Sequence, residues 1–219
     1  KEKQKPDLEI MIHLAEKGSA AMGHVEFAFE DKVYSYACYN YLNRRLFGGI
    51  GDGIFGIFDK KAYLKYCICE KNRFIISYGV KLTNKEKENV TKEIDKLIST
   101  NTEIWYPEIK YYEDGLIEKR DFNEMANKIY KHANGKFYRF TKGKYKTFFV
   151  LRTNCATCVD NIFNAIGTKI INLEGIISPG TYYSYLEKEY HKKNSKIISK
   201  TLYTKELIEK LNYKYVKRK

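Results

Sequence analysis

Apolar and other side chains alternate near the start of the chain, and this pattern predicts an antiparallel hairpin preceded by one more strand. The first strand is expected over residues 8–14, and the two hairpin strands over residues 25–29 and 33–39. A period of two residues is typical of a strand with one buried face. Asp31 and Lys32 lie between the two later segments, where they predict a tight turn.

Capping residues and a helical spacing of apolar positions predict several helices farther along the chain. Thr83 and Glu86 form a capping box that opens a helix ending near Ser99, because each side chain reaches the free backbone N–H of the other residue. The other predicted helices are residues 121–132, residues 155–166 with Gly167 as the stop, a helix capped by Ser178 with Pro179 at its first position, and a last helix capped by Thr204.

The segments between these helices are predicted to be strands or connections. Glycines are concentrated in residues 44–58, which predicts a surface loop that is either mobile or borders an active cleft. No linker or internal repeat divides the chain, so we expect one domain over residues 1–219 with flexible ends at 1–7 and 214–219. Strands are expected over residues 62–69, 74–82, 147–151 and 169–173, and an aromatic connection over residues 101–112.

The composition agrees with a packed globule and narrows the classes of partner. Hydrophobic residues make up 43% of the 219 residues, and 40 Lys and Arg against 27 Asp and Glu give a net charge of +13. This charge favours contact with an anionic surface such as a membrane or wall polymer, or it is a solvated lysine-rich surface. No RNP, KH or zinc-finger pattern is present, so nothing favours nucleic acid as a partner. The sequence contains no run of about 18 apolar residues, so no transmembrane segment is predicted.

Cys155 lies where a strand-like run gives way to a helix-like run, at a position that favours a reactive thiol. Unpaired N–H groups and the helix dipole stabilise a thiolate in the first turn of a helix. The same N–H groups could hold the oxyanion of an acyl-transfer reaction. Three alternatives remain open: Cys155 and Cys158 could be small buried core residues, a redox pair, or half of a zinc site completed by Cys67 and Cys69.

His24 is the histidine best placed to serve as the base for such a thiol. It begins the predicted hairpin and follows Gly23, which lets another backbone or a substrate approach closely. A lone histidine in a strand is also compatible with a purely structural role. If His24 and Cys155 meet in space, the imidazole can accept the thiol proton, and the chain is a cysteine-dependent hydrolase or acyltransferase.

The order of these motifs resembles the circularly permuted branch of the papain-like, NlpC-type cysteine hydrolases, in which the histidine strand precedes the cysteine helix. The Asn154-Cys155 pair also resembles that of lecithin:retinol acyltransferase-like proteins. The chain is most similar to the family of the N-terminal periplasmic domain of Lnb-type bacterial membrane proteins. The segments that carry these similarities are Gly23-His24, Tyr36-Ala37 with Asn40, residues 53–58, Asn72-Arg73 leading to residues 81–83, Asn154-Cys155, and the later helix start at Ser178-Pro179.

The resemblance implies an α+β fold of the permuted papain-like type, with an antiparallel sheet packed against helices. It implies Cys155 as nucleophile and His24 as base, with Asn154 and Ala156 supporting the oxyanion. It implies no cofactor and no metal. The candidates for the residue that orients the histidine are Tyr36, named first, and Glu26, Ser35 and Asn40.

The resemblance further implies reaction at an amide, ester or thioester bond of a peptide, cell-wall or lipid acyl substrate. It also implies an extracytoplasmic location, either periplasmic or secreted. The alternative is a non-catalytic binding module on the same fold, which attaches to anionic cell-envelope surfaces. Two departures from the family are visible. This sequence does not include the long membrane portion of Lnb-type proteins, and Cys158 stands where many relatives have another residue.

Overall fold

A computed structural model describes residues 5–14, 23–165 and 178–216 of the chain. At its centre is an eight-stranded sheet in which every neighbouring pair of strands is antiparallel. The strands, in their order across the sheet, are β10 (Ile197–Tyr203), β6 (Ile75–Val80), β1 (Leu8–His13), β2 (His24–Phe29), β3 (Lys32–Ala37), β5 (Ile54–Asp59), β8 (Lys136–Phe140) and β7 (Thr102–Trp105).

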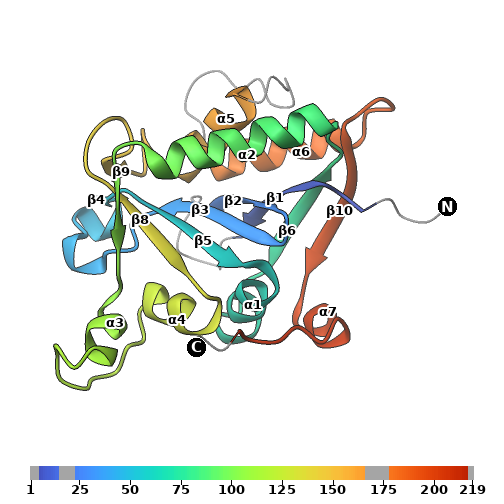
Figure 1. Cartoon of the computed structure of the whole chain (residues 1–219). Coiled ribbons are helices and arrows are strands. Elements are labelled where there is room, and N and C mark those ends of the chain that lie inside the picture. Colours follow the sequence, from blue (N-terminus) through green and yellow to red (C-terminus); the bar gives the residue numbers. More distant parts are fainter. Residues whose placement is uncertain (1–4, 15–22, 166–177, 217–219) are drawn as a thin grey trace.

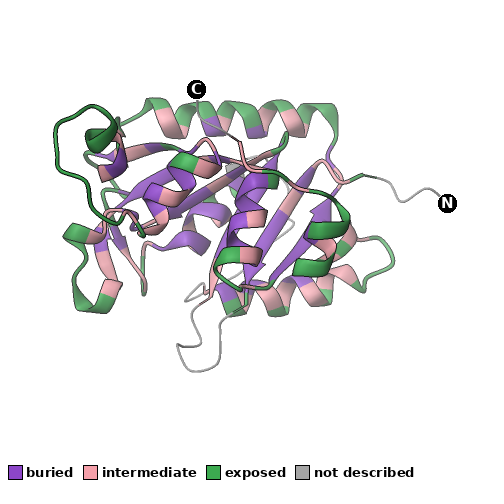
Figure 2. Cartoon of the chain, turned by 90° about the horizontal axis from the view of Figure 1, so that it is seen from below, coloured by how far each residue is buried: buried purple, intermediate pink, exposed green. Residues whose placement is uncertain are grey.

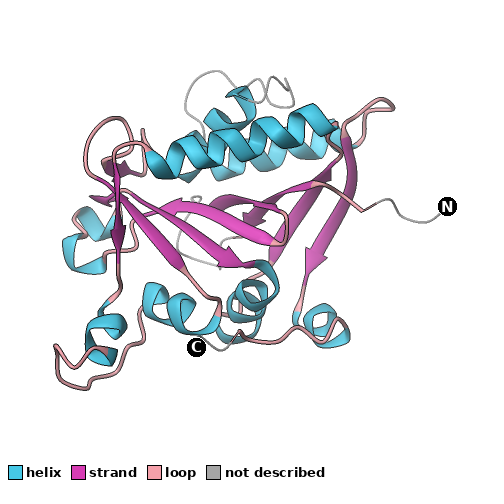
Figure 3. Ribbon diagram, in the orientation of Figure 1, coloured by secondary structure: helices cyan, strands magenta, loops and turns pink. Residues whose placement is uncertain are grey.

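The described residues also form seven α-helices, so the chain has an α+β architecture (Figure 3). The helices are α1 (Lys60–Lys65), α2 (Asn84–Ser99), α3 (Glu108–Glu113), α4 (Met125–His132), α5 (Cys155–Ala165), α6 (Pro179–Tyr190) and α7 (Lys205–Lys210). In Figure 1, α2, α5 and α6 lie above the sheet, and α1, α4 and α7 lie below it. None of the helices described is both long enough and apolar enough to span a membrane.

Shorter elements complete the described structure. A separate two-stranded sheet pairs β4 (Ile50–Asp52) with β9 (Thr147–Phe149). The others are a π-helix over Tyr66–Glu70 and two 3₁₀ turns, Tyr41–Asn43 and Leu46–Gly48.

Apolar layers on both sides of the sheet hold the helices in place. Above the sheet, Phe27 of β2 belongs to the same cluster as Phe163 of α5. Below it, Phe58 of β5 packs with Tyr63 of α1. Figure 2, which views the molecule from below, shows mostly buried strands and exposed residues on helices and loops. The central strands are therefore covered on both faces, and a polar side chain on them needs a partner inside the protein.

The strongest local signals of the sequence are confirmed. The capping box of Thr83 and Glu86 opens α2, and Ser178 and Thr204 cap α6 and α7 through their side chains. The first strand and the hairpin also form, but the turn lies one residue earlier than expected. Glu30 and Asp31 are its central residues, both with positive φ (49° and 60°), as two-residue hairpin turns require.

The strand predicted over residues 62–69 is wrong. This segment forms most of α1 and the π-helix that follows it. A short, continuous apolar run does not distinguish a buried strand from a buried helix. The signal that was missed is Asp59, whose side chain accepts a hydrogen bond from the N–H of Ala62 at 3.0 Å and so caps the helix.

The loop predicted for residues 44–58 is also wrong in its second half. Residues 54–58 belong to β5, an interior strand of the large sheet, and neither form a mobile loop nor border the site described below. The glycines obscured the apolar pattern of this strand. Gly53, just before it, is packed so closely that a Cβ atom would lie 1.8 Å from the carbonyl oxygen of Tyr145.

Three further boundaries differ from the predictions. The expected connection over residues 101–112 contains β7 and all of α3 but its last residue, and the helix expected over residues 121–132 begins only at Met125. The predicted strand over residues 169–173 and the stop at Gly167 lie outside the described residues.

Residues within the two end segments are attached to the body of the fold. Asp7 forms ion pairs with Lys81 at 3.1 Å and Lys87 at 2.8 Å. The N–H of Val216 donates to the carbonyl oxygen of His132 at 2.9 Å. Asp7 and Val216, which lie in the segments expected to be flexible, are therefore bonded to the fold.

Candidate active site

The pairing of β1 with β2 places two histidines directly opposite each other. His13, the last residue of β1, pairs with His24, the first residue of β2. Their ring centroids are 5.3 Å apart with an edge-to-face orientation. Gly23 allows this approach, because a Cβ atom there would lie 2.3 Å from the carbonyl oxygen of His13. The backbone of β1 at His13 therefore lies against Gly23, as expected for a glycine that lets another backbone approach.

Glu26 is fully buried and bonds to both histidines. It lies on the same face of β2 as His24, because side chains two residues apart in a strand point the same way. Its Oε1 accepts from Nε2 of His13 at 2.6 Å, and its Oε2 lies 3.3 Å from Nε2 of His24. Oε2 also accepts from the hydroxyl of Tyr63 at 3.0 Å. These partners satisfy the carboxylate inside an otherwise apolar core.

Ser35 of β3 is the second partner of His24. Its Oγ lies 2.7 Å from Nε2 of His24 and accepts from the hydroxyl of Tyr39 at 2.9 Å. Nε2 is therefore directed into the network of Ser35 and Glu26. The other ring nitrogen, Nδ1, is left to face a partner outside this network.

The imidazole has one further neighbour, Cys155, the first residue of α5. Its thiol lies close enough to the His24 imidazole for each group to shift the pKa of the other, and the N–H groups of Val25 and Ala156 favour its thiolate. The His24 side chain is 20% exposed, whereas Cys155 is only 5% exposed. Because α5 packs on β2, the first turn of the helix delivers the thiol to the first residue of the strand.

Asn154 positions this first turn. Its Oδ1 accepts from the N–H of Thr157 at 3.0 Å, the bond of a helix N-cap. Its amide nitrogen donates to the carbonyl oxygen of Val150 at 2.8 Å. The Asn154 side chain therefore supports the helix start, whereas the N–H of Ala156 lies at the sulfur itself.

The electrostatics favour a charged pair of Cys155 and His24. Burial alone would raise the pKa of Cys155, but the adjacent His24 and the N–H groups of Val25 and Ala156 bring it below its ordinary value. Burial alone would lower the pKa of His24, but the Cys155 thiolate and Glu26 raise it to about 10. Each charged form stabilises the other, so the pair of side chains favours the thiolate–imidazolium form over the neutral one.

Glu26 and His13 form the complementary half of the network. Burial works against the carboxylate, but His13 and His24 hold the pKa of Glu26 well below its usual range. Burial lowers the pKa of His13 despite the attraction of Glu26. In the described part of the chain, the buried Nδ1 of His13 has no hydrogen-bond partner, which fits a neutral ring that carries its proton on Nε2.

The structure places Tyr36 and Asn40, two of the predicted orienting residues, away from His24. The hydroxyl of Tyr36 donates to the carbonyl oxygen of Tyr145 at 3.0 Å. The amide of Asn40 donates to Asp52 at 2.9 Å. Tyr36, the first choice for the orienting residue, therefore gives way to Glu26 and Ser35, which were the alternatives.

The cysteines also occupy separate places. All five are unpaired. Cys67 and Cys69 lie on the π-helix below the sheet, in a different cluster from Cys155. Among the residues that the structure describes, no three His, Cys, Asp or Glu side chains are grouped to hold a metal ion.

The sequence contained a signal for Ser35 that the prediction did not use. In any hairpin with a two-residue turn at this place, odd-numbered residues of β3 share a face with even-numbered residues of β2. Ser35 must then face the side of His24 and Glu26, and Tyr36 must face the other side. No comparable local signal identifies His13, because its convergence on Glu26 depends on the pairing of β1 with β2.

Comparisons of the chain with protein families, with curated proteins and with solved structures found no match.

Proposed function

We propose that this protein is a cysteine-dependent hydrolase or acyltransferase, with Cys155 as nucleophile and His24 as base and acid. The observation that carries the proposal is the proximity of the His24 imidazole to the thiol at the start of α5, which packs on β2 and lets each group shift the pKa of the other. An activated cysteine needs an adjacent base that a third group orients. Glu26 and Ser35 are such groups here.

The chemistry follows from the order of these contacts. The Cys155 thiolate attacks the carbonyl carbon of an amide, ester or thioester, and the carbonyl electrons move to the oxygen. Backbone N–H groups of the Cys155 turn, with that of Ala156 nearest the sulfur, stabilise this oxyanion. The imidazolium of His24 then gives its proton to the leaving group as the acyl–Cys155 thioester forms. Water or an amine, deprotonated by His24, releases the acyl group and regenerates the thiol–imidazole pair.

The fold that we propose is the permuted papain-like one. Three observations support it: the histidine strand precedes the cysteine helix, the sheet is antiparallel, and α5 packs on β2. The proposed substrates are the acyl groups of peptides, cell-wall polymers or lipids, in a periplasmic or secreted location. The family resemblance supports this part of the proposal, and the reaction as written requires no cofactor.

Thiol labelling tests the activation of Cys155 without knowledge of the substrate. Cys69 is more exposed than Cys155, so a reagent guided by access alone labels Cys69 first. We expect iodoacetamide at neutral pH to modify Cys155 first, as mapped by mass spectrometry. His24→Gln should slow the labelling of Cys155 and leave that of Cys69 unchanged. Preferential labelling of Cys69 in the unaltered protein would contradict the proposal.

Activity on acyl esters, thioesters and peptide amides then tests catalysis. Cys155→Ala should abolish turnover, because the covalent intermediate cannot form. Cys158→Ala is the matched control, since Cys158 lies on the same helix and is also buried. Equal turnover by the unaltered protein and Cys155→Ala on every substrate would exclude the mechanism.

The second candidate is a non-catalytic binding module for anionic cell-envelope surfaces. The net charge of +13 and the low exposure of Cys155 favour it. Its signature is binding to anionic vesicles or wall polymer that weakens strongly with salt. Such binding together with an unreactive Cys155 would favour the module over the enzyme.

A further inference from the structure

Two neighbouring loop tips lie at one end of the molecule. The first tip, residues 45–49, precedes β4, and the second tip, residues 150–152, follows β9. Because β4 pairs with β9 and the N–H of Val150 donates to the carbonyl oxygen of Gly49 at 2.9 Å, the tips lie side by side. In Figure 1, β4 and β9 are on the left of the molecule, and β10 is on the opposite side.

Both tips place large apolar side chains in water. Leu46 of the first tip is 70% exposed, Phe47 beside it is fully exposed, and Leu151 of the second tip is 61% exposed. Single exposed leucines are common on protein surfaces. Three large apolar residues on adjoining tips form a patch, and such patches mark sites of interaction with a protein or a membrane.

The backbone of the first tip indicates that this exposure is selected. Leu46 and Phe47 both have positive φ (47° and 54°), a conformation that bulky residues rarely adopt. Hydrogen bonds fix the tip, because the N–H of Arg45 donates to the carbonyl oxygen of Ile50 at 2.8 Å and the N–H of Ile50 donates back at 3.2 Å. An unfavourable backbone that also exposes apolar side chains is expected where function, rather than stability, determines the conformation.

Each tip also carries an exposed arginine, Arg45 on the first and Arg152 on the second. In the parts of the chain that the structure describes, neither arginine is ion-paired with a carboxylate. The carboxylate of β4, Asp52, accepts instead from the amides of Asn40 and Asn43 at 2.9 and 3.0 Å. Guanidinium groups match the geometry of phosphate oxygens, so the two arginines are suited to bind lipid phosphates.

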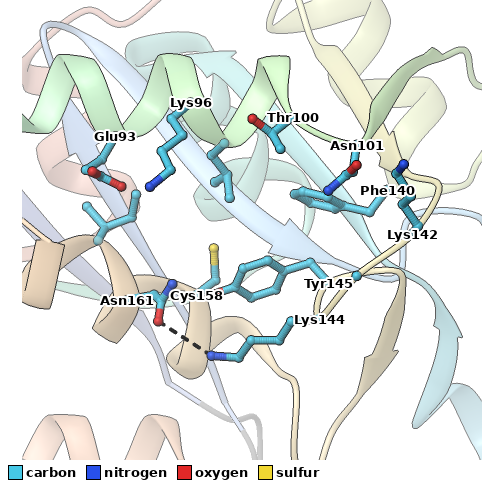
Figure 4. Close-up of a pocket in the computed structure, with 13 residues that line it drawn as sticks. Glu93, Lys96, Thr100, Asn101, Phe140, Lys142, Lys144, Tyr145, Cys158 and Asn161 are labelled. Carbon is cyan, nitrogen blue, oxygen red and sulfur yellow. Dashed lines mark hydrogen bonds between the residues drawn. The ribbon is translucent and has the colours of Figure 1, made fainter.

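Further positive charge lies on the connection from β8 to β9, which leads through β9 to the second tip. It carries three exposed lysines, Lys142, Lys144 and Lys146. Figure 4 shows Lys142 and Lys144 on this connection, where the Lys144 ammonium donates to Oδ1 of Asn161 at 3.5 Å. These lysines do not define a site by themselves. Together with the arginines of the tips, they favour a membrane that contains anionic lipids.

We propose that the two tips bind the surface of a lipid bilayer that contains anionic lipids. Leu46, Phe47 and Leu151 enter the boundary between the headgroups and the acyl chains, and Arg45 and Arg152 bind the lipid phosphates. Binding of this kind increases with the apolar area that enters the bilayer and with the attraction to anionic lipids. The partner is a bilayer rather than a second protein, because both tips combine apolar and cationic side chains in the way that acyl chains and phosphates require.

The second tip also connects the membrane contact to the candidate active site. The amide of Asn154 donates to the carbonyl oxygen of Val150 at 2.8 Å, and Cys155 is the next residue. Membrane binding therefore holds the start of α5 near the lipid surface, which suits the lipid acyl groups among the proposed substrates. The membrane contact itself does not rest on the proposed function and holds whether or not the chain is an enzyme.

The test is vesicle flotation of the full chain carrying Cys155→Ala, so that no lipid is cleaved through Cys155. The vesicles contain either equal parts of phosphatidylglycerol and phosphatidylcholine or phosphatidylcholine alone. We expect the anionic vesicles to bind at least about tenfold more tightly than the neutral ones. Absence of binding to the anionic vesicles would overturn the proposal. Because Cys155 is replaced, this failure is distinguishable from failure of the proposed enzymatic function.

Replacement of an apolar residue tests whether the tips enter the bilayer. Phe47→Ser should weaken binding to the anionic vesicles about tenfold or more, the loss of one large apolar side chain from the lipid. Leu202→Ser is the control, because Leu202 is 48% exposed on β10, on the opposite side of the molecule. It should leave the affinity within about twofold. Both positions are exposed, so the melting temperature should persist. Equal losses of affinity would overturn the proposal.

A matched pair of double variants separates the tips from the general positive charge of the chain. Arg45→Gln with Arg152→Gln should weaken binding about twentyfold, since each arginine near an anionic bilayer contributes about fivefold. Lys61→Gln with Lys210→Gln removes the same charge from exposed positions on α1 and α7 and should leave the affinity within about threefold. Equal losses in the two double variants would show that the tips are not the site.

Sedimentation of the lipid-free chain tests the other occupant of the tips, a second copy of this chain. We expect the unaltered protein and Phe47→Ser to sediment alike, as monomers. A dimer that Phe47→Ser dissociates would overturn the proposal and assign the tips to a protein interface.

Discussion

His13 and His24 face each other across β1 and β2 and bond to the same carboxylate, Glu26, yet their pKa values move in opposite directions. The difference lies in the second neighbour of each ring. His24 meets the Cys155 thiolate, which raises its pKa to about 10, whereas His13 is buried without an anion of its own. Pairs of titratable groups whose environments separate their pKa values reveal acid and base roles. This difference supports the proposal that His24 is the reacting ring and His13 a neutral support for Glu26.

The lowered pKa of Cys155 predicts an unusual pH profile for its alkylation. The rate of an ordinary thiol falls about a hundredfold from pH 8 to pH 6, because only the thiolate reacts. The rate of Cys155 should fall by clearly less than this over the same range, since His24 lowers the pKa of the thiol. Iodoacetamide labelling followed by mass spectrometry measures the alkylation rate of Cys155 at each pH, and N-acetylcysteine amide serves as the ordinary thiol. A hundredfold fall at Cys155 would show that the ion pair is absent.

The raised pKa of His24 predicts that removing the Cys155 thiol will in turn change the titration of the imidazole. The thiolate of Cys155 is the largest cause that raises this pKa. In Cys155→Ala the pKa of His24 should therefore fall below about 10, because the imidazolium loses its anionic neighbour. Titration of the imidazole proton by NMR measures this fall, and Cys158→Ala is the control that should leave the pKa of His24 in place. An unchanged pKa in Cys155→Ala would mean that the two side chains do not interact.

Glu26→Gln should impair both catalysis and folding. Breaking a buried charge pair lowers the free energy of unfolding by about 3 kcal/mol, and a poorly oriented imidazole lowers kcat by about a hundredfold or more. Tyr36→Phe is the comparison, because its hydroxyl bonds to the Tyr145 carbonyl rather than to His24. It should leave kcat within about threefold. The reverse ranking, with Tyr36→Phe the more damaging to kcat, would restore Tyr36 as the orienting residue.

The depressed pKa of Glu26 also determines how its contribution to stability changes with pH. The unfolded chain takes up the proton near pH 4.5, before the folded chain does. The contribution of Glu26 to stability is thus complete above that pH and is lost as the pH falls toward the lower folded pKa. The difference in unfolding free energy between the unaltered protein and Glu26→Gln should therefore shrink below pH 4.5. Denaturant titration at pH 7 and pH 3.5 checks this; a larger difference at pH 3.5 would contradict it.

Gly23→Ala should destabilise the protein and disturb His24. The new Cβ atom would lie 2.3 Å from the carbonyl oxygen of His13, so β1 and β2 must separate. Overpacking of this kind lowers the free energy of unfolding by about 1–3 kcal/mol. Gly180→Ala is the control, because its new Cβ atom meets only Ser178, at 3.8 Å. This substitution should leave the free energy of unfolding unchanged or slightly higher. Equal melting temperatures for Gly23→Ala and the unaltered protein would show that the close approach is absent.

Several parts of the site could be read from the chain because they depend on neighbours in sequence. The hairpin that begins with His24, the helix that begins at Cys155 and the caps at Thr83, Ser178 and Thr204 all follow from local patterns. Their physical basis is local as well: alternation decides which side chains are buried, and a capping side chain bonds to an N–H a few residues away. Where local signals were mixed, as in residues 54–58 and 62–69, the prediction was wrong.

The sequence by itself determined the candidate residues and the strand and helix that carry them. Only the tertiary structure decided which of them meet. Glu26 acquires its two histidines because β1 pairs with β2, and Cys155 reaches His24 because α5 packs on β2. Burial then makes these contacts strong enough to shift pKa values. No window of sequence contains this information, because it arises from surfaces that are far apart in the chain and become neighbours only when the core forms.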